Sequence, residues 1–461
     1  MNYLRLALEQ SVFSIGVSRP NPAVGAVVVK DGIVVGKGRT QRPGGAHAEV
    51  MALRDAGELA RGAAIYVTLE PCCHYGRTPP CTKAIIDAGI AKVFYAHGDP
   101  NPVVRGNSRK ILEEAGIEVY EGVDACIAAE IESGWDDDNC GGECHCLSSS
   151  HSPTPPGVIL SGEPQGSESK NLASHSKAAV AEGSEVFHDI ERYFEAYDYF
   201  VRNKRTFVEV KSAITDEGSM GYVLPDGSHK PMKITGEGAN CWNHELRAIS
   251  DAILVGAGTV LADNPSLNVR NAAGNDPVKI VWAGHHEFSE AEVATLKVFG
   301  LCHSERSDDM ELSATCCTTI PRFEGAESRD VPVIRALVFS CVPQPNIPNA
   351  VVFTKSTFAD CWSEMLDHLS ALGMHRLMVE PGAGLAKQLF ADVAATSAQK
   401  PLWNRLDLWR STDHTIEDAL ASFIDEGSVA KTLDFPAIPE KLIARESFMV
   451  GPDVLTVFYP G

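Results

Sequence analysis

Residues 23–36 read Ala-Val-Gly-Ala-Val-Val-Val-Lys-Asp-Gly-Ile-Val-Val-Gly, two short apolar runs on either side of Lys30-Asp31-Gly32. An Asp-Gly pair between two β-branched runs is a strong hairpin signal, because both residues accept the positive φ angles of a tight turn. The stretch therefore predicts two antiparallel strands, Ala23–Val29 and Ile33–Gly36.

Helical and extended segments alternate on both sides of this hairpin. Before it, apolar residues recur at helical spacing from Leu4 to Ile15. After it, the sequence predicts in turn a helix at His47–Leu59, a strand at Ala64–Leu69, a helix at Thr82–Ala88, a strand at Val93–Ala96, a helix at Arg109–Ala115 and a strand at Ile117–Tyr120. Such alternation is typical of an α/β sandwich with crossover helices.

The chain is long enough for two or three domains, with 461 residues. We predict a first domain at 1–135 and, at 136–190, a linker rich in Ser, Gly and Pro that we expect to be disordered. A second α/β domain is predicted at 191–461, and its first strands are expected at Phe207–Ala213, Ala252–Val255 and Val278–Trp282. An irregular stretch near 284–330 is expected to be a surface insertion.

Charge and hydropathy argue against several classes of protein. The chain carries 40 Lys and Arg against 61 Asp and Glu, and a net charge of −21 disfavours a nucleic-acid partner. No run of about 18 apolar residues exists, so no membrane span is expected. Thirteen cysteines and a helix in place of a leader argue for a cytoplasmic protein with reduced thiols.

The sharpest chemical signal is His47-Ala48-Glu49, followed by Pro71-Cys72 and then Cys81. One imidazole and two thiolates bind zinc and leave its fourth position open for water, as a catalytic site requires. Zinc lowers the pKa of that water, and Glu49 lies two residues from the histidine, where it can move the proton. We therefore predict the metal ligands His47, Cys72 and Cys81, with Glu49 as the catalytic proton shuttle.

Two neighbouring side chains, Cys73 and His74, compete with Cys72 as donors. We favour Cys72 because it follows the proline, and the whole arrangement is similar to the His-x-Glu and Pro-Cys motifs of zinc nucleobase deaminases. A binding or scaffold protein with a structural zinc remains an alternative, and such a site would have four protein ligands.

Longer strings carry a closer resemblance. Residues 20–26 (PNPAVGA), 47–50 (HAEV), 68–81 (TLEPCCHYGRTPPC) and 99–102 (DPNP) resemble the bifunctional deaminase–reductase family of riboflavin biosynthesis. The resemblance implies a cytidine-deaminase-like three-layer sandwich. It also implies hydrolytic deamination of 2,5-diamino-6-(ribosylamino)pyrimidin-4-one 5′-phosphate, with Asn21 as a possible substrate contact.

The second half resembles the reductase domain of the same family, which has a dihydrofolate-reductase-like α/β fold and uses NADPH. The stretch from Leu246 to Arg270 carries this resemblance, with a Gly-Ala-Gly-Thr loop after a buried strand. It implies cofactor contacts at Ala213, Thr259, Asp263, Gly382, Ala383, Gly384 and Leu385. It implies substrate contacts at Ser228, Arg247, Leu267, Arg270 and Glu380. Lys211 is a possible proton donor during hydride transfer.

Some positions depart from the family pattern. Thr215-Asp216-Glu217-Gly218 replaces Ser-Leu-Asp-Gly, Lys233-Ile234-Thr235 replaces Trp-Ile-Thr, and Ala283-Gly284 replaces Asp-Ser. We favour deamination followed by NADPH-dependent reduction of the ribosyl to a ribityl side chain. The alternatives are a deaminase with a catalytically degenerate reductase-like domain, and an RNA or nucleoside deaminase. The resemblance also implies a homo-oligomer.

Overall fold

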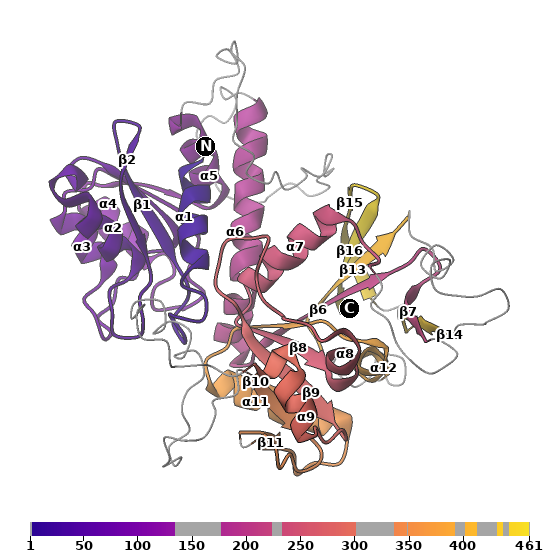
Figure 1. Ribbon diagram of the computed structural model, residues 1–461. Coiled ribbons are helices and arrows are strands. Elements are labelled where there is room, and N and C mark those ends of the chain that lie inside the picture. Colours follow the sequence, from indigo (N-terminus) through magenta and orange to yellow (C-terminus); the bar gives the residue numbers. More distant parts are fainter. Residues whose placement is uncertain are drawn as a thin grey trace, which may run out of the picture. The chain divides into compact units, whose positions relative to one another are not determined.

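The computed structural model describes residues 2–133, 177–223, 233–300, 336–347, 349–391, 402–412, 431–436 and 442–460. The chain divides into two compact units (Figure 1). The first consists mainly of residues 2–133 and helix α6 (Lys177–Asn203), and the second of residues from Thr206 onward. Among the described helices, none has the length and apolar composition to cross a membrane.

A five-stranded sheet forms the centre of the first unit. Its strands lie in the order β2 (Ile33–Arg39), β1 (Gly25–Lys30), β3 (Ala64–Leu69), β4 (Lys92–His97) and β5 (Glu118–Glu121). β1 is antiparallel to β2 and β3, and β3, β4 and β5 are parallel. The hairpin prediction is confirmed, because Lys30 pairs with Ile33 and the turn residues Asp31 and Gly32 have φ angles of 50° and 77°.

Helices cover both faces of this sheet and give the predicted three layers (Figure 1). α1 (Tyr3–Val12) and α5 (Gly122–Glu132) pack on one face. The other face carries α2 (Ala48–Ala56), the short 3-10 helix η1 (Gly57–Ala60), α3 (Cys81–Asp87) and α4 (Asn107–Glu114).

Strand glycines let the helices approach this sheet closely. A Cβ added at Gly25 would lie 1.8 Å from the Ala7 carbonyl oxygen of α1, and one at Gly38 would lie 2.1 Å from the Ala48 carbonyl oxygen of α2. Both distances are far below van der Waals contact, so only glycine fits there. The close approach at Gly38 fixes the N-terminal turn of α2, which begins directly after His47.

Helix α6 is where the structure departs from the predicted linker at 136–190 and the predicted second domain at 191–461. The helix begins at Lys177 and spans the predicted boundary, and it belongs to the first unit. Val186, Ile190 and Phe194 recur every four residues and are at most 1% exposed, so this apolar face holds the helix against α5 and β4. Residues 134–176 lie outside the described part of the chain.

A nine-stranded sheet forms the centre of the second unit. Its strands lie in the order β11 (Val351–Val352), β10 (Ala336–Ser340), β9 (Val278–Gly284), β8 (Ala252–Gly256), β12 (Arg376–Val379), β6 (Phe207–Ile214), β13 (Arg405–Ser411), β16 (Asp453–Pro460) and β15 (Leu442–Val450). The strands from β11 to β13 are parallel, and the β15–β16 hairpin is antiparallel at the end. β7 (Ser219–Val223) and β14 (Lys431–Asp434) form a separate two-stranded sheet.

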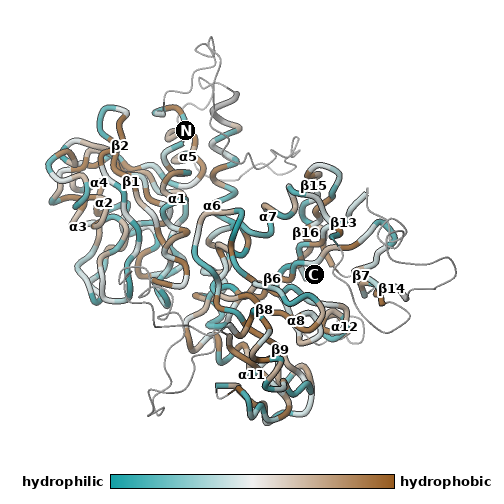
Figure 2. The backbone as a smooth tube through the Cα atoms, viewed as in Figure 1, coloured by the Kyte–Doolittle hydropathy of each residue, from teal (hydrophilic) through white to brown (hydrophobic). Residues whose placement is uncertain are grey.

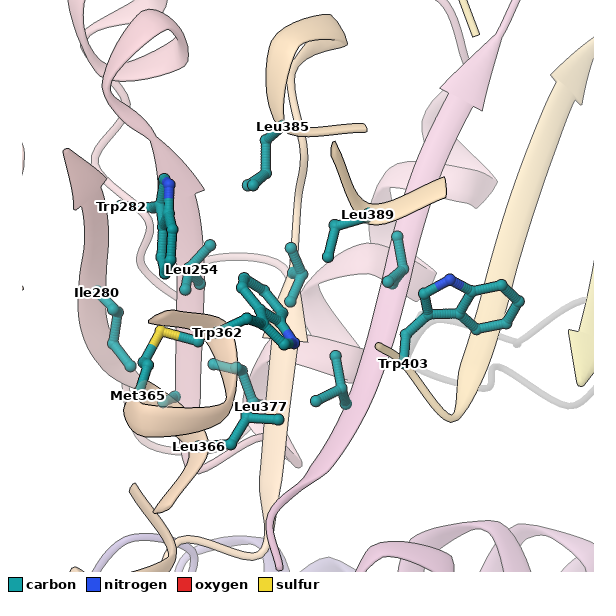
Figure 3. Packing of buried hydrophobic residues seen from close by; sticks show 14 of the residues in the cluster. Leu254, Ile280, Trp282, Trp362, Met365, Leu366, Leu377, Leu385, Leu389 and Trp403 are labelled. Atoms are coloured by element: carbon teal, nitrogen blue, oxygen red, sulfur yellow. The ribbon is translucent and has the colours of Figure 1, made fainter. Parts of the chain in front are cut away.

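Apolar residues on alternate positions of these strands face two separate cores. The helices of this unit are α7 (Glu237–Ala248), α8 (Ala257–Asp263), α9 (Glu290–Thr295), η4 (Lys297–Phe299), α11 (Phe358–Ala371) and α12 (Ala383–Ala391). Leu254 and Leu377 pack with Trp362 of α11 in one core (Figure 3). Ile253 and Met378 belong to the other. Apolar strands such as β1 and β8 are brown in Figure 2.

The predicted surface insertion near 284–330 is wrong for its first part. Phe288, Val298 and Phe299 are completely buried in the second core, and the segment between them forms α9 and η4. These three apolar side chains lack a regular period, which is why the sequence pattern missed them. Residues 301–335 lie outside the described part of the chain.

Replacing Gly25 by alanine is expected to destabilise the first unit by about 2–3 kcal/mol, because the methyl group would overlap the α1 backbone. Thermal or urea unfolding measures the loss. Gly98→Ala is the matched control, since nothing lies within 4 Å of a Cβ there. Equal stability of the two variants would contradict the close approach of α1 to β1.

Candidate functional sites

Three side chains from separate segments converge in the first unit. His47 directly precedes α2, Cys72 lies in the loop after β3, and Cys81 is the first residue of α3. His47 Nδ1 lies 3.5 Å from Cys72 Sγ and 3.3 Å from Cys81 Sγ, and the three atoms lie within 4.8 Å of one another. Within the described ranges, no other group of His, Cys, Asp and Glu converges in this way.

The donor set fits a zinc ion. One imidazole nitrogen and two sulfurs are ligands that zinc prefers, and three protein ligands leave a fourth position open. The Cys81 N–H donates a hydrogen bond to Cys72 Sγ at 3.3 Å. Hydrogen bonds from Cys81 and His47 lower the pKa of Cys72, which favours the thiolate that a metal ion binds. The partner thiol, Cys81, has its pKa raised by the same contact and by burial.

Glu49 lies in the first turn of α2 and is only 4% exposed. Burial raises the pKa of its carboxyl to about 7. A carboxyl group with this pKa can both accept and release a proton near neutral pH, which is what a general acid–base requires.

A second carboxylate, Glu70, braces the loop that carries Cys72. It accepts hydrogen bonds from the backbone N–H groups of Gly106 at 2.9 Å, Ser108 at 3.3 Å and Asp99 at 3.3 Å. The Ser108 hydroxyl donates to the Pro71 carbonyl next to Cys72. The sequence did not indicate this role, because the partners lie 29 to 38 residues downstream and only Asp99 belongs to the Asp-Pro-Asn-Pro string.

The competing donors lie apart from the group of three. The Cys73 thiol donates to the Val103 carbonyl at 3.6 Å, and burial raises its pKa. His74 is exposed. Asn21 is half-buried in a turn, where its N–H donates to the Ser18 carbonyl at 2.9 Å.

In the second unit, the carboxyl ends of β8, β12 and β6 lie side by side, because these strands are parallel neighbours. This edge is where open α/β sheets bind ligands. Lys211 and Ala213 are on β6, and Thr259 is in α8 after β8. The predicted residues Gly382, Ala383, Gly384 and Leu385 follow β12 at the start of α12.

The turns after β8 and β12 touch. A Cβ added at Gly382 would lie 2.6 Å from Thr259 Oγ1, and one at Gly256 would lie 3.7 Å from the Leu385 Cβ. A side chain at Gly382 would therefore require the Thr259 hydroxyl to rotate away. Asp263 is the last residue of α8 and is exposed, at the opposite end of that helix from the turn.

Three of the predicted substrate residues, Arg247, Glu380 and Arg270, belong to one hydrogen-bond network. Arg247, near the end of α7, donates from Nε and Nη2 to Glu380 at 2.9–3.0 Å and from Nη1 to the Asn268 carbonyl at 3.2 Å. The Arg270 guanidinium donates to Asn268 Oδ1 at 2.6 Å and is exposed. Leu267 is 1% exposed, with a φ of 52°. Ser228 lies outside the described residues.

Opposite charges set the ionisation of this network. Burial raises the pKa of Glu380, but Arg247 and Lys211 outweigh that effect, so its pKa lies below the usual value. Burial lowers the pKa of Lys211. Burial also lowers the pKa of His244, whose Nδ1 accepts a hydrogen bond from the backbone N–H of Arg270 at 3.1 Å. His244 is 1% exposed, and no spacing in the sequence singled it out.

Both halves of the chain are similar to known protein families. Residues 2–97 match the family model of the cytidine and deoxycytidylate deaminase zinc-binding region, and residues 221–393 match the RibD C-terminal domain. The riboflavin biosynthesis protein RibD of Actinobacillus pleuropneumoniae is 34% identical over 281 residues, and that of Aquifex aeolicus is 36% identical over 281 residues. Both halves of the chain are therefore similar to RibD proteins. Each alignment covers 61% of this chain, but only 57% and 60% of these RibD proteins.

Solved RibD structures extend the likeness over the whole fold. A Thermotoga maritima diaminohydroxyphosphoribosylaminopyrimidine deaminase/5-amino-6-(5-phosphoribosylamino)uracil reductase is 25% identical, with a TM-score of 0.58. Acinetobacter baumannii RibD is 22% identical with a TM-score of 0.56, which shows the fold alone. Both comparisons cover 100% of this chain and 98% of the solved one.

We expect the purified chain to hold one zinc ion, and Cys72→Ser or Cys81→Ser to lower this content at least tenfold, because each removes one of three protein ligands. Elemental analysis after dialysis gives the stoichiometry. Cys73→Ser is the matched control and should keep the metal. Loss of zinc from the Cys73 variant, with retention in the Cys72 variant, would reverse the ligand assignment.

Proposed function

We propose that the chain catalyses two reactions of riboflavin biosynthesis: hydrolytic deamination of 2,5-diamino-6-(ribosylamino)pyrimidin-4-one 5′-phosphate and NADPH-dependent reduction of the ribosyl to a ribityl side chain. The observation that carries the first reaction is the His47, Cys72 and Cys81 group beside the buried Glu49. The match of residues 221–393 to the RibD C-terminal domain supports the second.

In the deaminase unit, His47, Cys72 and Cys81 would hold a zinc ion, whose Lewis acidity would activate water for deamination at ring carbon 2. Glu49 takes the proton from the attacking water and passes it to the departing amine, and its pKa of about 7 suits both steps. Asn21 contributes a polar contact to the substrate.

In the reductase unit, Arg270 is the exposed cation of the substrate network and binds the ribose phosphate. The other substrate contacts come from Arg247, Leu267, Glu380 and Ser228. The hydrogen bond between Arg247 and Glu380 fixes the positions of both side chains in that site. Ala213, Thr259, Asp263 and residues 382–385 would hold NADPH, which would supply the hydride. Lys211 gives the proton that accompanies hydride transfer.

A deaminase with a degenerate reductase-like domain is the second candidate, and the departures at Lys233 and Ala283-Gly284 motivate it. Two contacts favour the active reductase over it: the Gly382–Thr259 approach and the Arg247–Glu380 pair. A homo-oligomer, a cytoplasmic location and the lack of a nucleic-acid partner remain predictions.

The test is a coupled assay with the diaminopyrimidinone ribosyl phosphate, in which ammonia release and NADPH oxidation are followed separately. We expect both signals. Ammonia without NADPH oxidation would establish the degenerate-reductase alternative. The absence of ammonia would contradict the proposed deaminase.

Glu49→Gln should keep the zinc ion and lower the kcat of deamination by about 10³-fold or more, because an amide cannot move protons. Ammonia release and metal content are measured on the same preparation. Glu58→Gln, an exposed position in η1, serves as the control. Activity near that of the wild type would refute the proton-shuttle role.

Arg270→Ala should raise the KM of the phosphorylated substrate at least tenfold and leave the KM of NADPH within about twofold, because only the phosphate loses an ionic partner. Steady-state NADPH oxidation at varied concentrations of each reactant separates the two constants. The control is Arg445→Ala, another exposed arginine in the same unit. A change confined to NADPH would overturn the assignment.

A further inference from the structure

Helix α6 lies outside both matched family models, yet three of its side chains contact His97 at the end of strand β4. His97, the last residue of β4, is 7% exposed. Its Nδ1 pairs with Glu191 Oε1, its Nε2 pairs with Asp198 Oδ1 at 2.9 Å, and its ring stacks on Phe194 with centroids 5.1 Å apart.

These partners come from one face of α6. Glu191, Phe194 and Asp198 are spaced by three and four residues, so they line about two turns of the helix. A histidine with a carboxylate on each ring nitrogen carries a proton on both, because neither carboxylate oxygen can donate when ionised. The contact is therefore a buried imidazolium held between two carboxylates.

His97 is joined directly to the backbone that carries the metal-site loop. Its carbonyl accepts the Glu70 N–H at 2.8 Å, in the parallel pairing of β4 with β3. The chain after His97 supplies the three N–H donors to the Glu70 carboxylate and the Ser108 hydroxyl that binds Pro71. His97 is therefore linked to Glu70 in two ways, directly through its carbonyl and indirectly through the segment that follows it. Glu70 and Pro71 immediately precede Cys72 in the chain.

We propose that His97, clamped by Glu191 and Asp198 of α6, is a positioning residue of the deaminase site. It acts through Glu70 and residues 99–108 on the loop that carries Cys72. The assignment rests on the proposed function for its kinetic consequence. Its structural consequence, the order of residues 99–108, is independent of catalysis.

The pH dependence of this clamp follows from the charge on His97. Burial lowers the pKa of His97, but Asp198 and Glu191 outweigh burial and raise it to about 9. The clamp is therefore intact at neutral pH and is lost as the pH rises through about 9. The neighbouring titratable groups are Arg202, which pairs with Asp198 at 3.1 Å, Cys126 of α5, and Tyr197 and Asp99.

The same helix offers a matched control. Asp189 of α6 pairs with Arg5 of α1 at 3.0 Å, and this ion pair fixes α6 to the unit without touching His97. Removing the Asp189 charge weakens the docking of α6 by one ion pair. Removing the charges of Glu191 and Asp198 also releases the His97 imidazolium. If α6 only supported the unit, the two sets of substitutions would have the same effect.

The experiment compares the full-length wild type with E191Q/D198N and D189N. Hydrogen exchange of the peptide covering residues 99–108 is measured first, followed by the pH profile of ammonia release from pH 6 to 10. In E191Q/D198N we expect faster exchange in this peptide and a kcat about tenfold lower at pH 7.5, because small misplacements of catalytic groups are costly. The wild type should lose activity above about pH 9, and the double variant should lack that limb. D189N should resemble the wild type in all three readouts.

Two outcomes would overturn the proposal. One is unchanged exchange of residues 99–108 in E191Q/D198N, and the other is an equal effect of D189N, which would reduce α6 to general support. If the wild type releases no ammonia, the proposed function fails. The exchange data still decide whether His97 positions the loop.

Discussion

The constraint on which the first unit depends is the meeting of three chain segments at one point. His47 comes from the start of α2, Cys72 from the loop after β3 and Cys81 from the start of α3, and their donor atoms lie within 4.8 Å of one another. When both thiols are ionised, the two thiolates repel each other unless a cation binds between them. The surrounding structure holds them together, through the close packing of α2 on Gly38 and the hydrogen bonds of Glu70.

The second unit achieves its site by a different means. Here β8, β12 and β6 are parallel neighbours, so the segments that follow them gather at one edge of the sheet. Glycine again permits the closest contact, between Gly382 and Thr259. Arg247 forms an ion pair with Glu380 and, together with Lys211, keeps the Glu380 carboxyl ionised although it is largely buried. Arg270 remains exposed beside this pair.

Much of the first unit follows from local sequence. The Asp-Gly hairpin and the strand at Ala64–Leu69 have the predicted positions, because turn chemistry and apolar runs act over a few residues. The helix predicted at His47–Leu59 ends at Ala56, since Gly57 has a φ of 53°. The buried Phe288 was missed because no regular period marks it. The partners that hold α6 in the first unit, α5 and β4, are distant from it in the sequence. The hydrogen bonds of Glu70 and the contact of His244 with Arg270 also join residues distant in the sequence, so local patterns do not predict them.

The central claim is a zinc ion with three protein ligands and one open position, and the zinc-edge X-ray absorption spectrum of the purified chain tests it most directly. The account predicts two sulfurs at about 2.3 Å and two nitrogen or oxygen neighbours at about 2.0–2.1 Å. One of the lighter neighbours should exchange when a competing small ligand is added. Three or four sulfurs, or a ligand shell that nothing displaces, would mean a closed structural site and would contradict the account.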